Sequence, residues 1–205
     1  IHLIHLSEGR VKSAALSKGF ASVHGEAVVM LDGDGQDDPA EIPKMLMRLG
    51  IAPDGKEPLP AEADLVNGWK TPRLDPWHKT IPSCVFNILV SWLTNLSLHD
   101  HNCGLKAMRR EVAQDLPLGT GMHRFIPVLA ASSGGRVVEQ AVHHRPRTQG
   151  VSKYGVGRFF RGLFDLVTVW LKLQTGKLST QIQKPVPSTS TKTLRIFLYG
   201  LLTVI

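Results

Sequence analysis

Residues 26–39 read EAVVMLDGDGQDDP, an apolar run that passes directly into an acidic loop. The run Glu26–Leu31 has the length and the branched side chains of a buried strand. A second apolar run, Ile1–Leu6, lies upstream of it. Between the two, Val11–Val23 is rich in Ala, Leu and Lys, which favour a helix, and Gly25 marks its end. These three segments predict a β-α-β unit that opens into the acidic loop.

The rest of the chain continues this alternation of strands and helices. Gly50–Ala63 contains three prolines and is expected to be a loop. Further helices are expected at Glu41–Leu49, Thr80–Leu96 and His123–Ser132, and further strands at Asp64–Gly68 and Arg136–Val142. The pattern predicts an α/β fold with a mainly parallel, doubly wound sheet.

The composition bounds the class of protein. The chain has 205 residues, 42% hydrophobic and 20% charged, which is enough for one ordinary domain with a core. Collagen, low-complexity disorder and a disulfide scaffold are excluded. The two cysteines, Cys84 and Cys103, support neither a zinc knuckle nor a secreted disulfide framework, so a reducing compartment is expected.

The net charge of +7 is concentrated near the C-terminus. Residues 1–134 carry a net charge of −2 and residues 135–205 a net charge of +9, with Glu139 and Asp165 as the only acids in the second part. Nucleic acid, an anionic membrane surface and phosphorylated ligands all fit such a basic stretch.

The acidic loop Asp32–Pro39 is the first candidate site, because ligands of such sheets gather at the carboxyl ends of the strands. Asp32 and Asp34 flank a glycine and can converge on a hard cation that bridges a diphosphate. An acidic turn in which Asp37 or Asp38 caps the following helix is the alternative. A calcium loop fits poorly, since a strand precedes it and Pro43 stands at its twelfth position.

Four segments taken together carry a family resemblance. In chain order they are Asp32–Pro39, Asn67–Asp75 leading to Lys79 and Ser83, Asp100–Lys106, and His144–Tyr154. They resemble the polyprenyl-phosphate sugar transferases of glycosyltransferase family 2, the family of dolichol-phosphate mannose synthase, over about residues 1–173. The resemblance implies a sheet of the nucleotide-sugar glycosyltransferase (GT-A) type. Four ordered motifs are much more specific than any one of them.

The resemblance implies a metal and donor site in the acidic loop. The family's Asp-x-Asp-x-Gln positions serve the metal and the nucleotide-sugar diphosphate, and here they fall on Asp32, Asp34 and Gln36. Two carboxylates and an amide oxygen are ligands that Mg²⁺ or Mn²⁺ accepts. The donor implied is a GDP- or UDP-linked sugar.

The resemblance also implies an acceptor-side loop. Arg73, with Ser83 at the start of the next helix, matches this loop, and a guanidinium can grip phosphate oxygens as a fork. Lys70 and Lys79 match it as well, although each also fits a solvated basic loop.

Asp100 matches an acidic residue near the family's active site. The alternative is an aspartate that only stabilises a turn, and its sequence would look the same.

A last basic cluster, Arg147, Ser152 and Lys153 around Gly150, matches the segment that closes over the phosphates in the family. The implied reaction is inverting transfer of the sugar to dolichyl or undecaprenyl phosphate. This acceptor is already largely anionic at neutral pH, so no strong general base is required. The implied catalytic residues are Asp32, Asp34, Asp100 and Arg73.

The C-terminal part predicts contact with a membrane surface. We expect a partial catalytic domain over 1–156, an amphipathic helix over 157–176, a linker over 177–193 and an apolar tail over 194–205. The helix has a polar stripe of Arg161, Asp165, Thr168 and Lys172 and suits a bilayer interface, although a core-facing helix is the alternative. The tail is shorter than the roughly 20 residues of a spanning helix. We expect a membrane-associated protein whose catalytic domain faces the cytoplasm.

Departures from the family pattern leave other hypotheses open. The family's first strand and nucleotide loop have no counterpart, and Val11 replaces a usual glycine, so the sequence is expected to begin inside a longer protein. A truncated or inactive homologue that binds a membrane or a partner is the second hypothesis. A basic nucleic-acid module is the third, but no binding motif supports nucleic acid as a partner.

The histidines offer a weaker metal hypothesis. His99, His101 and Cys103 are closely spaced, but a fourth zinc ligand is missing. His143 and His144 end a strand with opposite facing, so they are not expected to bind one ion together.

Overall fold

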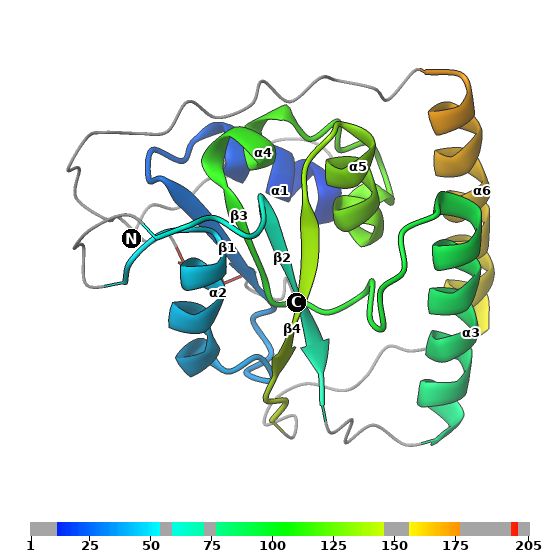
Figure 1. Ribbon diagram of the computed structural model, residues 1–205. Helices are drawn as coiled ribbons and strands as arrows, with labels where there is room; N and C mark the ends of the chain where they lie inside the picture. Colours follow the sequence, from blue (N-terminus) through cyan, green and yellow to red (C-terminus); the bar gives the residue numbers. More distant parts are fainter. Residues whose placement is uncertain (1–11, 54–58, 72–76, 146–155, 177–197, 201–205) are drawn as a thin grey trace.

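A computed structural model describes residues 12–53, 59–71, 77–145, 156–176 and 198–200 (Figure 1). Five strands form one sheet in the order β4-β2-β3-β1-β5. Their bounds are Ala27–Leu31 (β1), Leu65–Lys70 (β2), Lys106–Arg109 (β3), Val137–Val142 (β4) and Leu198–Gly200 (β5). The predicted strand Ile1–Leu6 and the linker lie outside the described residues.

The strand directions agree with a mainly parallel sheet except at its centre. β1 pairs in parallel with β5, and β2 pairs in parallel with β4. β3 is antiparallel to both β1 and β2 and so joins the two parallel pairs. The register sets Asn67 of β2 opposite Lys106 of β3, which brings the second and third family segments side by side.

Helices cover both faces of the sheet. Their bounds are Lys12–Ala21 (α1), Ile42–Arg48 (α2), Trp77–Thr94 (α3), Arg110–Asp115 (α4), Ile126–Ser132 (α5) and Val156–Gln174 (α6), with 3-10 turns at Pro39–Glu41 (η1) and Met122–Phe125 (η2). α2 packs on the face that carries Val29 and Val66, and the other α-helices pack on the face that carries Val28 and Leu65. Alternate residues of each strand therefore belong to two separate hydrophobic cores, one on each face of the sheet.

The predicted helices and strands within the described ranges are confirmed with shifts of a few residues. β3 and α4 were not predicted, because their ten residues Lys106–Asp115 hold five charged side chains and no apolar period. Part of the predicted apolar tail, Leu198–Gly200, forms β5 along the edge of β1. Among the described residues, no helix is both long and apolar enough to cross a membrane.

Candidate active site

The carboxylates of Asp32 and Asp37 lie against the backbone of Gly104. A Cβ atom at Gly104 would stand 2.7 Å from Oδ2 of Asp32 and 2.5 Å from Oδ2 of Asp37. This close approach requires a glycine. Asp32 directly follows β1, and Gly104 lies two residues before β3, so the site is built where adjacent strands meet their loops. Two acidic side chains thus converge on one point at the edge of the sheet.

Hydrogen bonds within the acidic loop fix this arrangement. The backbone N–H of Asp32 donates to Oδ2 of Asp37 at 3.1 Å. Oδ1 of Asp34 accepts from the backbone N–H of Gln36 at 3.2 Å, and Gly35 closes the turn at a φ of 75°. Asp38 caps η1 by accepting from Ala40 at 3.0 Å, so the capping role predicted for Asp37 or Asp38 is confirmed for Asp38. The contacts thus place Asp37, one of the two alternative caps, beside Asp32.

Lysines stabilise the negative charge at this acidic pair. Nζ of Lys12 lies 2.5 Å from Oδ1 of Asp32. Burial alone would raise the pKa of Asp32, but Lys12, Lys70 and Lys106 outweigh it and lower that pKa. Burial raises the pKa of Asp37, and the neighbouring Asp32 carboxylate adds to the rise. The two carboxylates therefore differ: Asp32 is held firmly ionised and Asp37 is ionised at a cost.

Lys106 is fully buried under this site. Its ammonium donates to the side-chain oxygen of Asn67, to the carbonyl of His101 at 3.2 Å and to the carbonyl of Cys103 at 2.8 Å. Burial lowers its pKa. Three acceptors match the three protons of an ammonium, so the charge is satisfied without water. Lys106 thereby orders the loop that runs from Asp100 to Gly104.

Asp100 is buried in that loop and belongs to the same charged centre. Its backbone carbonyl accepts from Nδ2 of Asn67 at 2.7 Å, and its backbone N–H donates to Oε1 of Glu139 at 3.0 Å. Burial opposes the charge of Lys70, yet Asp100, Asp37 and Asp32 raise the pKa of Lys70. The structure therefore brings Asp100 and the acidic loop to one lysine.

Gln36 connects the acidic loop to the chain that leaves β4. Its Nε2 lies 3.2 Å from Nε2 of His144, and its backbone carbonyl accepts from the N–H of Arg145 at 2.9 Å. Asp38 and Arg145 form an ion pair at 2.7 Å. His144 is buried and His143 is exposed, which confirms their opposite facing. The basic segment after β4 thus leaves from the edge of the acidic loop.

The other predicted site residues divide into two groups. Arg73, Arg147, Ser152 and Lys153 lie outside the described residues. Ser83 is buried in α3, but this helix begins at Trp77 rather than at Thr80. The unpaired amide donors of a helix belong to its first turn, so the expectation that Ser83 starts the helix and lies beside them is wrong.

The residues of the weaker zinc hypothesis make contacts that are unrelated to one another. His99 stacks on Trp69 with ring centroids 4.1 Å apart, and His101 contacts Ser91 at 3.0 Å. Burial lowers the pKa of His101 to about 4 and raises the pKa of Cys103 to about 12. Across the described ranges, no group of three or more His, Cys, Asp or Glu side chains is arranged to hold a metal ion.

Comparisons with known proteins point to one family. The model of glycosyl transferase family 2 matches residues 1–116. The chain is 36% identical over 172 residues to the dodecaprenyl-phosphate galacturonate synthase of Rhizobium johnstonii, covering 82% of this chain and 48% of that protein. It is 32% identical over 155 residues to the undecaprenyl-phosphate 4-deoxy-4-formamido-L-arabinose transferase of Aeromonas hydrophila, covering 76% and 44%. The chain spans about half the length of these curated relatives.

Solved structures show the same fold. Glucosyl-3-phosphoglycerate synthase from Mycobacterium tuberculosis, crystallised with Mn²⁺ and UDP-glucose, matches with a TM-score of 0.58 at 17% identity, over 80% of this chain and 56% of that one. Its complex with phosphoglyceric acid matches with a TM-score of 0.59, over 82% and 56%. The sheet and its helices therefore have the GT-A architecture.

Proposed function

Because the chain belongs to glycosyltransferase family 2, we propose that it transfers a sugar from a nucleotide diphosphate sugar to a polyprenyl phosphate. The observation that carries the proposal is the convergence of Asp32 and Asp37 on Gly104, beside Lys12 and Lys70. This arrangement suits a bound diphosphate, and the curated relatives of the chain include two that are named for dodecaprenyl and undecaprenyl phosphate. Those names favour a bacterial polyprenyl phosphate as the acceptor.

The acidic pair fits a hard divalent cation. Carboxylate oxygens are the ligands that Mg²⁺ and Mn²⁺ prefer, and such ions are commonly held by one or two carboxylates plus substrate phosphates. Asp32 and Asp37 would hold the ion, with Asp34 and Gln36 near it as the family pattern implies. A bound cation would neutralise the charge that develops on the departing diphosphate. The Lys12 ammonium, 2.5 Å from Asp32, marks where positive charge is already stabilised.

The reaction then needs alignment more than proton transfer. An oxygen of the acceptor phosphate forms a bond to the anomeric carbon, while the bond from that carbon to the donor diphosphate breaks. The bonding electron pair leaves with the nucleoside diphosphate, and the configuration inverts. A phosphate monoester loses its second proton near pH 6, so its oxygen is a competent nucleophile at neutral pH without a base.

The side chains of the site divide this work. Lys12 and Lys70 lie among the carboxylates and would balance the charge of two anionic substrates. Asp100, fixed by Asn67 and Glu139, would orient the sugar or the acceptor.

The acceptor phosphate would be held by the two basic segments of the family pattern. Arg73 would form one side of this site, and Arg147, Ser152 and Lys153 would form the other. Support for the second side comes from the contacts of Gln36 and Asp38 with Arg145, which tether the start of that segment to the acidic loop.

The proposed setting is the cytoplasmic surface of a membrane. Residues 1–156 would form the catalytic domain and residues 157–176 an interfacial helix, because the lipid acceptor resides in the bilayer. The donor would be a GDP- or UDP-linked sugar, and Mg²⁺ or Mn²⁺ the cation.

The proposal is tested by transfer of radiolabel into lipid. The full protein in membranes is incubated with labelled UDP- or GDP-sugars, undecaprenyl phosphate and Mn²⁺ or Mg²⁺, and the lipid is extracted. We expect labelled lipid with one donor, its loss with a chelator, and its loss in an Asp32→Asn variant. A protein that binds Mn²⁺ and nucleotide but labels no lipid with any of these donors would instead be the inactive homologue.

A further inference from the structure

His99 has an exposed side chain that is nevertheless held in one orientation. The side chain is 66% exposed, yet Nδ1 of its ring lies 2.8 Å from Oε2 of Glu139. The ring also stacks on Trp69, with the ring centroids 4.1 Å apart and the two planes 16° from parallel. Fixing a side chain in this way costs rotamer freedom. The ring is therefore ordered in advance of any ligand.

The carboxylate of Glu139 also fixes the backbone at His99. Oε2 accepts from the backbone N–H of His99 at 2.8 Å, and Oε1 accepts from the backbone N–H of Asp100 at 3.0 Å. The Glu139 side chain is itself only 12% exposed, and its residue lies opposite Asn67 in the register of β4 and β2. The ring and the backbone of His99 therefore rest on the same carboxylate that orders Asp100.

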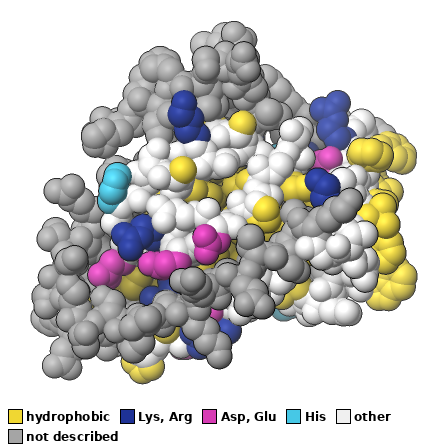
Figure 2. Space-filling view, turned by 90° about the horizontal axis from the view of Figure 1, so that it is seen from above, with side chains coloured by type: hydrophobic (Ala, Val, Ile, Leu, Met, Phe, Trp, Pro, Cys, Tyr) yellow, Lys and Arg dark blue, Asp and Glu magenta, His cyan; other side chains and the backbone are white. Residues whose placement is uncertain are grey.

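A pair of opposite charges at the surface would not by itself mark a site. Figure 2 shows Lys and Arg side chains beside Asp and Glu side chains on one face of the molecule. Such exposed pairs are common and contribute little to stability. His99 differs from them because two contacts act on one ring. The stack on Trp69 sets the plane of the ring, and the hydrogen bond to Glu139 sets its rotation within that plane.

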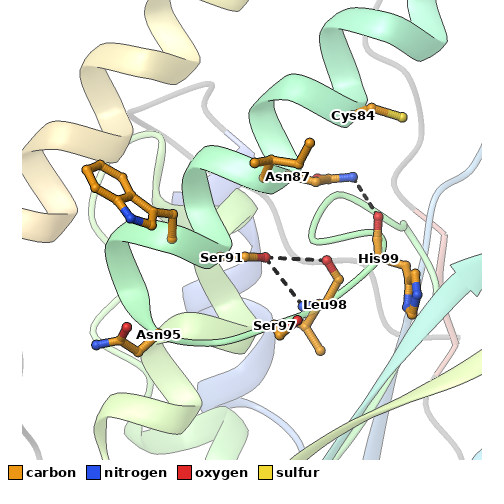
Figure 3. Close-up of a pocket in the computed structure, with 9 residues that line it drawn as sticks. Cys84, Asn87, Ser91, Asn95, Ser97, Leu98 and His99 are labelled. Atoms are coloured by element: carbon orange, nitrogen blue, oxygen red, sulfur yellow. Dashed lines mark hydrogen bonds between the residues drawn. The ribbon is translucent and has the colours of Figure 1, made fainter.

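α3 fixes the chain on either side of this ring. Nδ2 of Asn87 donates to the His99 carbonyl at 2.8 Å, and Oγ of Ser91 accepts from the backbone N–H of Leu98 at 3.4 Å. Figure 3 shows both contacts, with the His99 ring turned away from α3. The ring therefore lies toward the carboxyl end of β2, where it meets Trp69.

The His99 ring lies at the same edge of the sheet as the acidic loop, but on the other face. Trp69 and Lys70 are neighbours in β2, so their side chains point to opposite faces of the sheet. Trp69 is on the face that α3 covers, whereas the charge of Lys70 interacts with Asp32 of the acidic loop. Lys70 also interacts with Asp100, the residue after His99. Asp100 therefore connects the acidic loop to the ring.

The chemistry of the ring fits a phosphate monoester. A carboxylate only accepts hydrogen bonds, so Nδ1 of His99 donates to Glu139 and Nε2 is the nitrogen that can meet a ligand. In a protonated ring Nε2 donates to an anionic oxygen, and in a neutral ring it accepts from a P–O–H group. A phosphate monoester loses its second proton at about pH 6, so near neutral pH the ring and the phosphate can share one proton in either arrangement. The diphosphate of a nucleotide sugar is esterified at both ends and carries no such proton.

We propose that Nε2 of His99 binds an oxygen of the acceptor phosphate, with Glu139 and Trp69 as the residues that orient the ring. The identity of this ligand as a polyprenyl phosphate rests on the proposed function, whereas binding of a phosphate monoester does not depend on turnover. The acceptor phosphate then lies on the α3 side of Asp100 and the donor on the side of the acidic loop. His99 thereby becomes a binding residue that acts beside the basic segments.

Calorimetry with a short prenyl phosphate tests the proposal without turnover. Farnesyl phosphate is titrated into the full protein with no donor present. His99→Asn keeps an amide donor for Glu139 but removes the nitrogen at the Nε2 position, so the affinity for farnesyl phosphate should fall at least about tenfold. Tenfold corresponds to about 1.4 kcal/mol, and a hydrogen bond to a charged group is worth at least that. The affinity for UDP with Mn²⁺ should stay unchanged.

Two further variants separate binding from folding. His99→Gln places an amide near the Nε2 position and should recover part of the lost affinity. The matched control is His24→Asn, which changes another exposed histidine, located before β1 at the end of that strand opposite to Asp32. It should bind farnesyl phosphate as the wild type does. In the transfer assay, His99→Asn should raise KM for the acceptor at least about tenfold and leave KM for the donor unchanged.

Three results would overturn the proposal. If the wild type does not bind farnesyl phosphate, or His99→Asn binds it equally well, the ring makes a structural contact only. A loss of affinity confined to UDP with Mn²⁺ would assign the phosphate at His99 to the donor. Equal losses in His99→Asn and His99→Gln, with a lower midpoint of urea unfolding for both, would mean that the variants act through folding.

Failure of the proposed function gives a different result. A wild type that binds farnesyl phosphate through His99 but labels no lipid with any donor would keep the phosphate site and lose the transferase function. A wild type that labels lipid, with the same KM for the acceptor in His99→Asn, would keep the transferase function and lose the role of His99.

Discussion

Lys106 and Asn67 face one another across β3 and β2, and the lysine ammonium donates to the Asn67 side-chain oxygen. The amide nitrogen of Asn67 in turn donates to the Asp100 carbonyl at 2.7 Å. The pairing of β2 and β3 therefore fixes the position of the loop that holds Asp100. A buried charge serves here to position a catalytic candidate rather than to contact substrate.

Replacement of Lys106 by Met should destabilise the protein and impair the site. The change leaves the Asn67 oxygen and the carbonyls of His101 and Cys103 without their donor, and each buried acceptor left unpaired costs about 1–3 kcal/mol. We expect the free energy of unfolding in urea to fall by at least about 2 kcal/mol. The exposed Lys44→Met on α2 is the control and should change it by less than about 0.5 kcal/mol. Equal stability of the two variants would show that Lys106 does not order the loop.

The sequence could predict the outline of the fold because its strands and helices carry clear periods. Glu26–Leu31 is an apolar run of strand length and Arg136–Val142 is a short segment with three valines, and both proved to contain strands. β3 could not be found in this way, since its four residues include Lys106 and Arg109 and pair only with strands distant in the chain. A buried lysine is rare, so nothing local marked Lys106 as an interior residue.

The candidate site was predictable in part for the same reason. Asp32 and Asp34 stood out because they follow a buried strand, and Gln36 stood out because it matches the family pattern. Asp37 did not, because its position beside Asp32 depends on Gly104, which is 67 residues away in the sequence. The triple spacing Asp32, Asp34 and Asp37 was the signal available, but a helix cap explained Asp37 equally well.

Asp37→Asn should separate stability from function. Burial raises the pKa of Asp37, so folding disfavours its charge, and at neutral pH the uncharged Asn should leave the free energy of unfolding equal or higher. This advantage should vanish as the pH falls through the folded pKa of Asp37, which lies above 3.8, because the wild-type group is then neutral too. Binding of Mn²⁺ with UDP, measured by calorimetry, should weaken at least about tenfold through loss of a ligand. Unchanged Mn²⁺ binding would exclude Asp37 as a ligand.

Gly104→Ala should displace both carboxylates. The new methyl group would stand 2.5 Å from Asp37 Oδ2 and 2.7 Å from Asp32 Oδ2, so the two side chains must move apart. Because a shift of about 1 Å at a reacting centre can cost about a hundredfold in rate, turnover should fall by that order. Gly157→Ala is the matched control, since a Cβ there meets nothing within 4 Å. Wild-type turnover with Gly104→Ala would mean that the acidic pair does not serve the reaction.

Arg147→Lys tests whether the segment after β4 grips a phosphate or only supplies charge. An ammonium keeps the charge but cannot reproduce the planar fork of a guanidinium, which binds two phosphate oxygens at once. If Arg147 holds the acceptor, kcat/KM for undecaprenyl phosphate should fall at least about tenfold, while the affinity for Mn²⁺ and UDP stays unchanged. Arg136→Lys is the control, because Arg136 pairs with Asp64 at the far end of β4 and is remote from the acceptor. Equal kcat/KM for Arg147→Lys and the wild type would mean that this segment attracts the acceptor only by its positive charge. Added salt should then lower kcat/KM of both proteins to the same extent.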